Sequence, residues 1–182
     1  DCLNYAHKLS LHNSDVGIIN CPINKNLLKK NKIGVTEFLA RKCKIKKDSE
    51  VMLIYNKKLA VSPITTHVNL KEVSKKINVP LIVNKVTKIN SWYINNFNKK
   101  PKIGILGLNP HNGELRKNSE EKKKIEPAVL KLKKLNINTK GPLVADTIFM
   151  NFNDYDVIVG MYHDQVLAPF KTIFKFNAIN IT

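Results

Sequence analysis

The stretch "DVIVGMYHDQ" (Asp156–Gln165) places an apolar run directly before four polar side chains. An apolar run of this kind is typical of a strand that is buried on both faces, as in the sheets of α/β proteins. In open α/β sheets, ligands bind beyond the carboxyl ends of the strands. The stretch therefore predicts an α/β fold with a functional site where this strand ends.

The rest of the chain alternates short apolar runs with longer helical patterns, which favours a largely parallel α/β sheet. Strands are expected at residues 15–20, in a hairpin around 51–65, at 102–108 and 156–162, and in the closing "NAINIT". Helices are expected at 69–77 and 81–97, from Ser119 through "SEEKKKIEPAVLKLKKL" with a restart at Pro127, and near 145–149.

The length of 182 residues suits one sizeable α/β domain or part of a larger two-domain protein. The chain begins with Asp1 and closes on a strand-like segment, so we expect a fragment cut at both ends. No apolar run reaches the ~18 residues of a membrane span, and the polar opening does not resemble a signal peptide. Three cysteines at unrelated spacings favour free thiols and a cytoplasmic protein.

The formal net charge is +17, and almost all of it comes from lysine, because Arg41 and Arg116 are the only arginines. Base readout favours arginine, and single-strand binding needs aromatic residues among the basic ones. Lysine is instead spread over every segment, which favours a solvated surface and is compatible with an anionic substrate. A basic nucleic-acid-binding module remains the less favoured alternative.

Three histidines each come within a few residues of the end of a predicted strand: His67 after "KLAVSPITT", His111 after "KIGILGLNP" and His163 after "DVIVGMY". Three imidazoles gathered at one edge of a sheet could hold a metal ion and leave a position for water or substrate. The alternative is that each is a hydrogen-bonded loop residue. His7 and His12 are interpreted as surface residues.

Polar neighbours of these histidines extend the candidate site. Asn109 and Glu114 could orient the neighbouring imidazole as outer partners of a metal ligand. Asp146 and Asp164 are the candidate catalytic carboxylates. Lys171 could meet an anionic group as a point charge.

Four motifs, "GLNPHNGE", "GPLVADTIF", "MYHDQVLAPFK" and "INIT", resemble in order and spacing the 4-hydroxythreonine-4-phosphate dehydrogenase family of vitamin B6 biosynthesis. "INCPINK", "GVTEF" and "TTHVNL" are similar to its earlier motifs. The resemblance implies the three-layer α/β/α fold of the isocitrate and isopropylmalate dehydrogenases, which binds NAD without a G-x-G-x-x-G fingerprint. The chain would be the incomplete central part of such a two-domain enzyme and inactive by itself.

The resemblance also implies the site. A divalent metal, usually zinc but also magnesium, manganese or cobalt, would be held by His67, His111 and His163 between the two subunits of a homodimer. NAD or NADP would be the redox cofactor. The phosphorylated substrate would be contacted by Thr36, Lys171 and Asn180.

The implied reaction is oxidation of 4-phosphooxy-L-threonine to 2-amino-3-oxo-4-phosphooxybutanoate, which decarboxylates to 3-amino-2-oxopropyl phosphate. Where the family usually has Gly-His-Thr-Glu, this chain has "GVTE", so Val35 replaces a substrate-contacting histidine. A paralogous dehydrogenase of a phosphorylated four-carbon sugar acid is therefore the alternative within the same fold.

Overall fold

The computed structural model describes residues 2–13, 17–21, 35–44 and 50–182. The chain divides into two compact units, residues 1–50 and residues 51–182, and each is described by itself. The second unit contains all six strands found among the described residues.

The first unit contains helices α1 (Cys2–His12) and α2 (Val35–Lys42). The expectation of a strand at 15–20 is wrong for residues 17–20, which form no strand and leave Ile19 fully exposed; residues 15 and 16 lie outside the described part. The expectation that His7 is a surface residue is also wrong. His7 is buried, and its Nε2 lies 3.4 Å from Cys43 Sγ, whereas His12 is exposed as expected.

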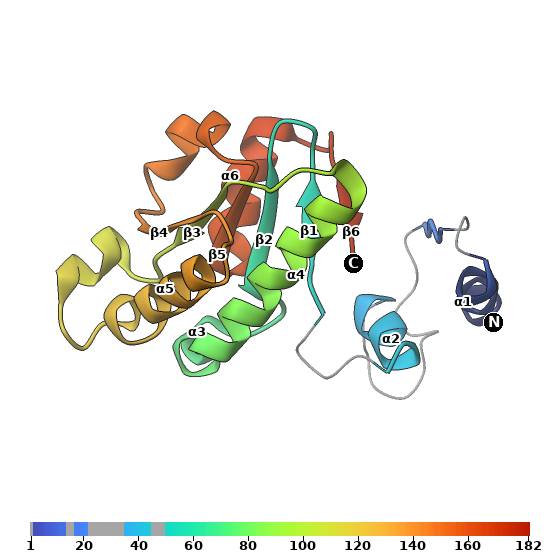
Figure 1. Ribbon diagram of the computed structural model, residues 1–182, viewed down its shortest axis with the longest axis horizontal. Helices are drawn as coiled ribbons and strands as arrows, with labels where there is room; N and C mark the ends of the chain where they lie inside the picture. Colours follow the sequence, from blue (N-terminus) through green and yellow to red (C-terminus); the bar gives the residue numbers. More distant parts are fainter. Residues whose placement is uncertain (1, 14–16, 22–34, 45–49) are drawn as a thin grey trace. The chain divides into compact units, whose positions relative to one another are not determined.

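The second unit is built on a mixed six-stranded sheet of order β4-β3-β5-β2-β1-β6 (Figure 1). Its strands are β1 (Leu53–Tyr55), β2 (Ala60–Thr65), β3 (Ile103–Leu106), β4 (Thr139–Leu143), β5 (Val157–Tyr162) and β6 (Ile179–Ile181). Strands β4, β3, β5 and β2 are parallel, while β1 runs antiparallel to both β2 and β6. The predicted hairpin, the strands near 102–108 and 156–162, and the closing strand are confirmed.

Helices cover both faces of this sheet (Figure 1). On one face α3 (Leu70–Lys76), α4 (Val79–Phe97) and α5 (Glu126–Lys134) pack against Val157 and Val159 of β5. On the other, α6 (His163–Phe174) and the 3₁₀ helix η4 (Ile148–Asp154) pack against Ile158. Because strand residues alternate between faces, an all-apolar strand fills both cores, and the predicted α/β class is confirmed.

Helix α4 supplies much of the first core. Asn78 precedes it, and the Asn78 side chain accepts a hydrogen bond from the Leu81 backbone N–H at 2.9 Å, which satisfies one free donor of the first turn. Ile82, Val86 and Ile89 are fully buried along one stripe. Each such side chain contributes about 1.5–3 kcal/mol to stability through burial. The predicted helices at 69–77 and 81–97 are thus confirmed.

The helical segment after Ser119 has two parts, as the restart at Pro127 predicts. A π-helical turn, η3 (Glu121–Ile125), leads into α5, whose second residue is Pro127. Proline is tolerated there because the first turn of a helix does not need its missing N–H. The helix expected near 145–149 exists as η4, which begins at Ile148.

Candidate metal centre

Three parallel strands deliver histidines to one edge of the sheet. The register pairs Thr65 of β2 with Tyr162 of β5, and β3 lies on the other side of β5 in the same direction. His67 follows the end of β2, His163 follows the end of β5 directly, and His111 lies in the loop after β3. The carboxyl ends of these strands therefore carry all three, as the sequence predicts.

Two of the three imidazoles meet within one chain. The ring centroids of His67 and His163 are 6.0 Å apart with a 36° tilt. They border a hollow of about 250 Å³ that is lined by Thr66, His67, Val68, Asn69, Leu70, Tyr162, His163 and Asp164.

The spacing of these two rings is close to that of two ligands of one metal ion. A zinc ion bound ~2.0–2.1 Å from a ring nitrogen lies roughly 3.2 Å from the ring centroid. Two rings that bind one tetrahedral ion have centroids about 5.2 Å apart, so the observed 6.0 Å between His67 and His163 is somewhat longer and would shorten when both rings bind the ion. The donor set of neutral imidazoles also suits zinc.

Asp164 contacts one of the two rings. Its Oδ1 lies 2.8 Å from Nδ1 of His163. In the neutral tautomer that carries its proton on Nδ1, the imidazole donates to this carboxylate oxygen and keeps a lone pair on Nε2. A carboxylate that orients a ligating histidine in this way is a recurring feature of metal sites. The contact is compatible with an orienting role for Asp164, and the catalytic role of Asp164 stays a prediction.

His111 lies in a loop of unusual backbone conformation. The 3₁₀ segment η2 (Pro110–Leu115) holds four consecutive residues, His111 to Glu114, at positive φ, with φ 49° at His111. Among the residues that the structure describes, no three histidine, cysteine or acidic side chains of one chain come close enough to bind a metal together. His111 therefore does not join His67 and His163 within a single chain.

The partners expected for His111 are engaged elsewhere or exposed. Asn109 donates its side-chain N–H groups to the carboxylates of Glu120 and Glu121, at 2.9 Å and 3.1 Å. Glu114 is exposed. Glu121 instead accepts hydrogen bonds from the backbone of this loop. The sequence did not indicate this role, because acidic residues after Ser119 are typical of the first turn of a helix.

Both glutamates are held in their ionised form. Burial alone would raise the pKa of Glu121, but hydrogen bonds from the backbone N–H and side chain of Asn109 and from the Leu108 N–H bring it below its ordinary value. Hydrogen bonds from the Ser74 hydroxyl and the Asn109 amide lower the pKa of Glu120.

The remaining predicted residues are dispersed. Asp146 is exposed in the turn after β4, at the same edge of the sheet as the histidines. Lys171 is exposed on α6, eight residues and therefore about 12 Å along the helix from His163. Asn180 of β6 pairs with Ile54, whose partner in β2 is Val61, about 13 Å of strand before Thr65.

Within one chain, Lys171 and Asn180 are thus not brought to the histidine pair. Thr36 lies in α2, and its side chain falls outside the described part of the structure.

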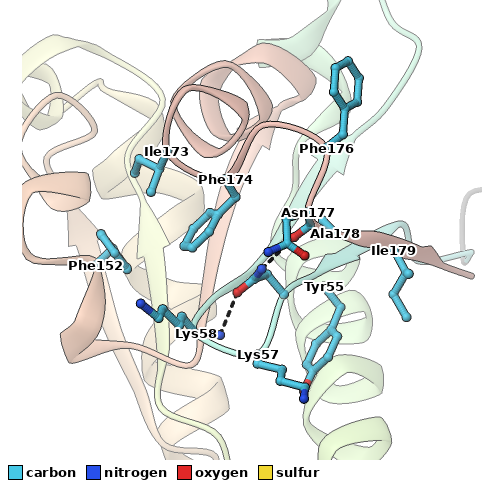
Figure 2. Close-up of a pocket in the computed structure, with 11 residues that line it drawn as sticks. Tyr55, Lys57, Lys58, Phe152, Ile173, Phe174, Phe176, Asn177, Ala178 and Ile179 are labelled. Atoms are coloured by element: carbon cyan, nitrogen blue, oxygen red, sulfur yellow. Dashed lines mark hydrogen bonds between the residues drawn. The ribbon is translucent and has the colours of Figure 1, made fainter.

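A larger hollow of about 780 Å³ lies at the opposite edge of the sheet, between the β1–β2 turn and the connection from α6 to β6 (Figure 2). Aromatic rings of Phe152, Phe174 and Phe176 and the side chains of Lys57 and Lys58 line it. The described residues around it include no carboxylate, imidazole or thiol. Acid–base or metal chemistry is therefore better supported at the histidine edge, although its hollow is smaller.

Comparison with protein-family models shows to which family the chain belongs. The family model described as "Pyridoxal phosphate biosynthetic protein PdxA" matches residues 1–182. The chain belongs to the PdxA family. The resemblance expected from "GLNPHNGE" and "MYHDQVLAPFK" is therefore confirmed.

Individual PdxA relatives agree with this membership. The chain is 41% identical over 170 residues to a 4-hydroxythreonine-4-phosphate dehydrogenase of Aquifex aeolicus, covering 91% of this chain and 52% of the relative. It is 38% identical over 188 residues to an Oceanobacillus iheyensis protein provisionally named D-threonate 4-phosphate dehydrogenase, covering 99% of this chain and 56% of the relative. The chain thus spans about half the length of these relatives.

A solved PdxA-family structure shares the fold. The 4-hydroxythreonine-4-phosphate dehydrogenase of Klebsiella pneumoniae aligns with a TM-score of 0.88 at 31% identity, over 100% of this chain and 56% of that chain. PdxA proteins use NAD(P) and a divalent metal, and the histidine pair described above is compatible with such an ion. None of the helices among the described residues is long and apolar enough to span a membrane.

Proposed function

We propose that this chain is the central part of a two-domain, NAD(P)-dependent dehydrogenase that oxidises 4-phosphooxy-L-threonine, with the fold of the isocitrate and isopropylmalate dehydrogenases. The observation that carries the proposal is the pair His67 and His163, 6.0 Å apart at the carboxyl edge of the sheet, with Asp164 bonded to the second ring. It lies in a chain of the PdxA family, whose relatives carry this activity in their names.

The histidines would bind a divalent metal, for which zinc suits the imidazole ligands best. Such a metal supplies Lewis acidity, which favours ionisation of a bound hydroxyl and stabilises the developing ketone. His67 and His163 would supply two of its ligands, and Asp164 would accept the hydrogen bond from Nδ1–H of His163. Asp146, exposed at the same edge, is the proposed proton acceptor.

A second copy of the chain would complete the site. One chain brings two imidazoles to within 6.0 Å of each other, measured between ring centroids, and a metal centre of this kind needs a third protein ligand. We propose that His111 of a second copy supplies it in a homodimer. Lys171, Asn180 and Thr36 would bind the substrate phosphate, and the distance of Lys171 and Asn180 from the histidine pair within one chain is compatible with a shared site.

In the proposed reaction the substrate hydroxyl loses its proton and the same carbon transfers a hydride to NAD(P)⁺, which leaves a ketone. The product, 2-amino-3-oxo-4-phosphooxybutanoate, is a β-keto acid. Its carboxylate leaves as carbon dioxide while the electron pair moves toward the ketone, giving 3-amino-2-oxopropyl phosphate after protonation. Binding energy from the remote phosphate would fix the geometry for hydride transfer.

A second substrate is supported by two observations. The Oceanobacillus iheyensis relative, similar over 99% of this chain, is provisionally named for D-threonate 4-phosphate. Val35 also replaces a polar histidine expected to face the substrate. The two substrates differ at the carbon that bears an amino group in one and a hydroxyl in the other, so the loss of one polar contact could change the preference.

The test is NAD(P)H formation by the whole protein on each substrate, with added zinc and after treatment with a chelator. We expect turnover of 4-phosphooxy-L-threonine that the chelator abolishes and zinc restores. Faster turnover of D-threonate 4-phosphate would mean that this compound, rather than 4-phosphooxy-L-threonine, is the preferred substrate. Absence of turnover on both, in protein that binds zinc, would contradict the dehydrogenase proposal.

A further inference from the structure

A buried carboxylate lies behind the loop that carries His111. Glu121 is only 1% exposed, in the π-helical turn η3. Its Oε1 accepts hydrogen bonds from the backbone N–H groups of Leu108 and Asn109, both at 2.8 Å, and its Oε2 accepts one from Asn109 Nδ2 at 3.1 Å. A buried charge is tolerated when it is satisfied in this way.

The carboxylate of Glu121 packs against two glycines of the loop, in space that a side chain at either position would occupy. A Cβ on Gly107 would lie 3.2 Å from Glu121 Oε1, and a Cβ on Gly113 would lie 2.8 Å from Glu121 Oε2. Gly113 also has a φ of +63°, a conformation that glycine adopts without steric strain. The backbone of residues 107–113 therefore wraps around the carboxylate.

The same network reaches the segment after His67. Asn109 Nδ2 donates to Glu120 Oε2 at 2.9 Å, and the hydroxyl of Ser74 donates to the other oxygen of Glu120. Ser74 belongs to α3, the helix that follows His67, and its carbonyl accepts a hydrogen bond from Lys124 Nζ at 2.6 Å. Hydrogen bonds thus link the His111 loop to the helix next to the histidine pair.

We propose that Glu121 is a positioning residue that holds the loop of residues 107–115 in the conformation that presents His111 to the metal. His111, Asn112 and Glu114 all have positive φ, which is unfavourable for residues with a side chain and needs external support. Glu121 gives that support through three hydrogen bonds and contacts neither substrate nor metal in this account. The inference deepens the proposed function and rests on it.

Only an ionised carboxylate satisfies all of these donors. The amide of glutamine would keep one acceptor for Leu108 and Asn109 but would turn an N–H group toward Asn109 Nδ2, which is itself a donor. Glu121→Gln therefore tests the contact with almost no change in volume. Asn109→Ala is the second variant, because it removes the side-chain link and leaves the backbone hydrogen bonds in place.

The matched control is Glu126→Gln. Glu126 lies on the same helical segment and forms an exposed ion pair with Lys122 at 2.7 Å, so the charge change is the same without the loop contact. Two quantities are measured in the whole protein: amide hydrogen exchange, compared between residues 107–115 and strand β5, and the dissociation constant for Zn²⁺ from competition with a chromophoric chelator.

For Glu121→Gln we expect exchange in residues 107–115 to rise about tenfold or more with β5 unchanged, and zinc affinity to fall about 10- to 100-fold. Asn109→Ala should also raise exchange in residues 107–115 and lower zinc affinity, but by smaller factors. Glu126→Gln should match the wild type in both measurements. Wild-type exchange and zinc affinity in Glu121→Gln, or an equal rise in exchange across β5, would overturn the inference.

The failure of the proposed function would look different. If His111→Ala left zinc affinity unchanged while Glu121→Gln still raised exchange of the loop alone, the metal site would be wrong and the anchoring of the loop would stand. If His111→Ala abolished zinc binding while Glu121→Gln did not affect it, Glu121 would not position His111.

Discussion

Nδ1 of His163 and Oδ1 of Asp164 lie 2.8 Å apart in two adjacent residues, where strand β5 passes into helix α6. The rings of His163 and His67 lie 6.0 Å apart, measured between their centroids, and both border the same hollow. The apolar residues of "DVIVGMYHDQ" are thus the buried strand, and the polar residues after it carry the proposed metal ligand His163 and its neighbour Asp164.

The first prediction concerns this pair. Asp164→Asn keeps an acceptor for Nδ1 but removes the charge that makes the imidazole a better ligand, so zinc affinity should fall about tenfold. Asp154→Asn, at an exposed position at the end of η4, should leave zinc affinity within about twofold of the wild type. Equal affinities for the two variants would remove the orienting role of Asp164.

The second prediction tests the shared site by complementation. His111→Ala and His163→Ala should each be inactive alone. If His111 reaches the metal of the partner copy, a mixed dimer of the two variants contains one intact site, and random mixing restores about a quarter of wild-type activity. Activity that stays at the background level after unfolding and refolding the mixture, with mixed dimers verified by mass, would place all three ligands in one chain.

The third prediction concerns the loop glycines. Alanine at Gly113 adds a Cβ 2.7 Å from Ser119 Cβ at a φ of +63°, so the variant should be less stable by about 1–2 kcal/mol or more. Gly17→Ala is the control, because nothing lies within 4 Å of its added Cβ. Urea unfolding of both variants measures the free energies, and unchanged stability in Gly113→Ala would mean that the loop conformation differs from the one described.

The fourth prediction concerns pH. The pKa of Glu121 is lowered in the folded state, so the unfolded chain takes up its proton first as the pH falls. The stabilisation from ionised Glu121 is therefore complete above the unfolded pKa of about 4.3 and is lost as the pH falls through the lower folded value. Urea unfolding at several pH values should show a shallower acid loss for Glu121→Gln than for the wild type; parallel curves would contradict the assignment.

The fifth prediction concerns the start of α4. Asn78→Ala removes the acceptor for the Leu81 N–H and should lower the free energy of unfolding by about 1 kcal/mol. Asn95→Ala, on the exposed surface of the same helix, should have little effect or stabilise slightly. Denaturant unfolding compares the two, and an equal response would show that Asn78 does not cap the helix.

The sequence predicts the strands whose apolar runs are uninterrupted, because burial on both faces leaves a strong local pattern. Strands β3 and β5 are of this kind. Strand β4 was not expected, because its Gly141 and Pro142 are typical of a turn; it is an edge strand, where proline is tolerated. The strand predicted at 15–20 shows the converse at residues 17–20, which form no strand, since a short apolar run alone does not determine sheet pairing.

For the candidate site, the sequence predicts where the histidines lie on the sheet but not their distances and contacts. Strand ends place His67, His111 and His163 at one edge, since the direction of parallel strands requires it. The distance between two rings, the hydrogen bond of Asp164 and the burial of Glu121 depend on packing between segments far apart in sequence, and no local pattern contains them. The separation of Lys171 and Asn180 from the histidine pair likewise follows from topology rather than from motif.

The central claim is that His67, His111 and His163 bind one divalent metal. Its most direct test is zinc titration of the whole protein and of the alanine variant of each histidine, with His12→Ala as the control for an exposed histidine. The account predicts one zinc ion per chain in the wild type and in His12→Ala, and loss of high-affinity binding in each of the three variants. Wild-type zinc affinity in any one of the three would contradict it.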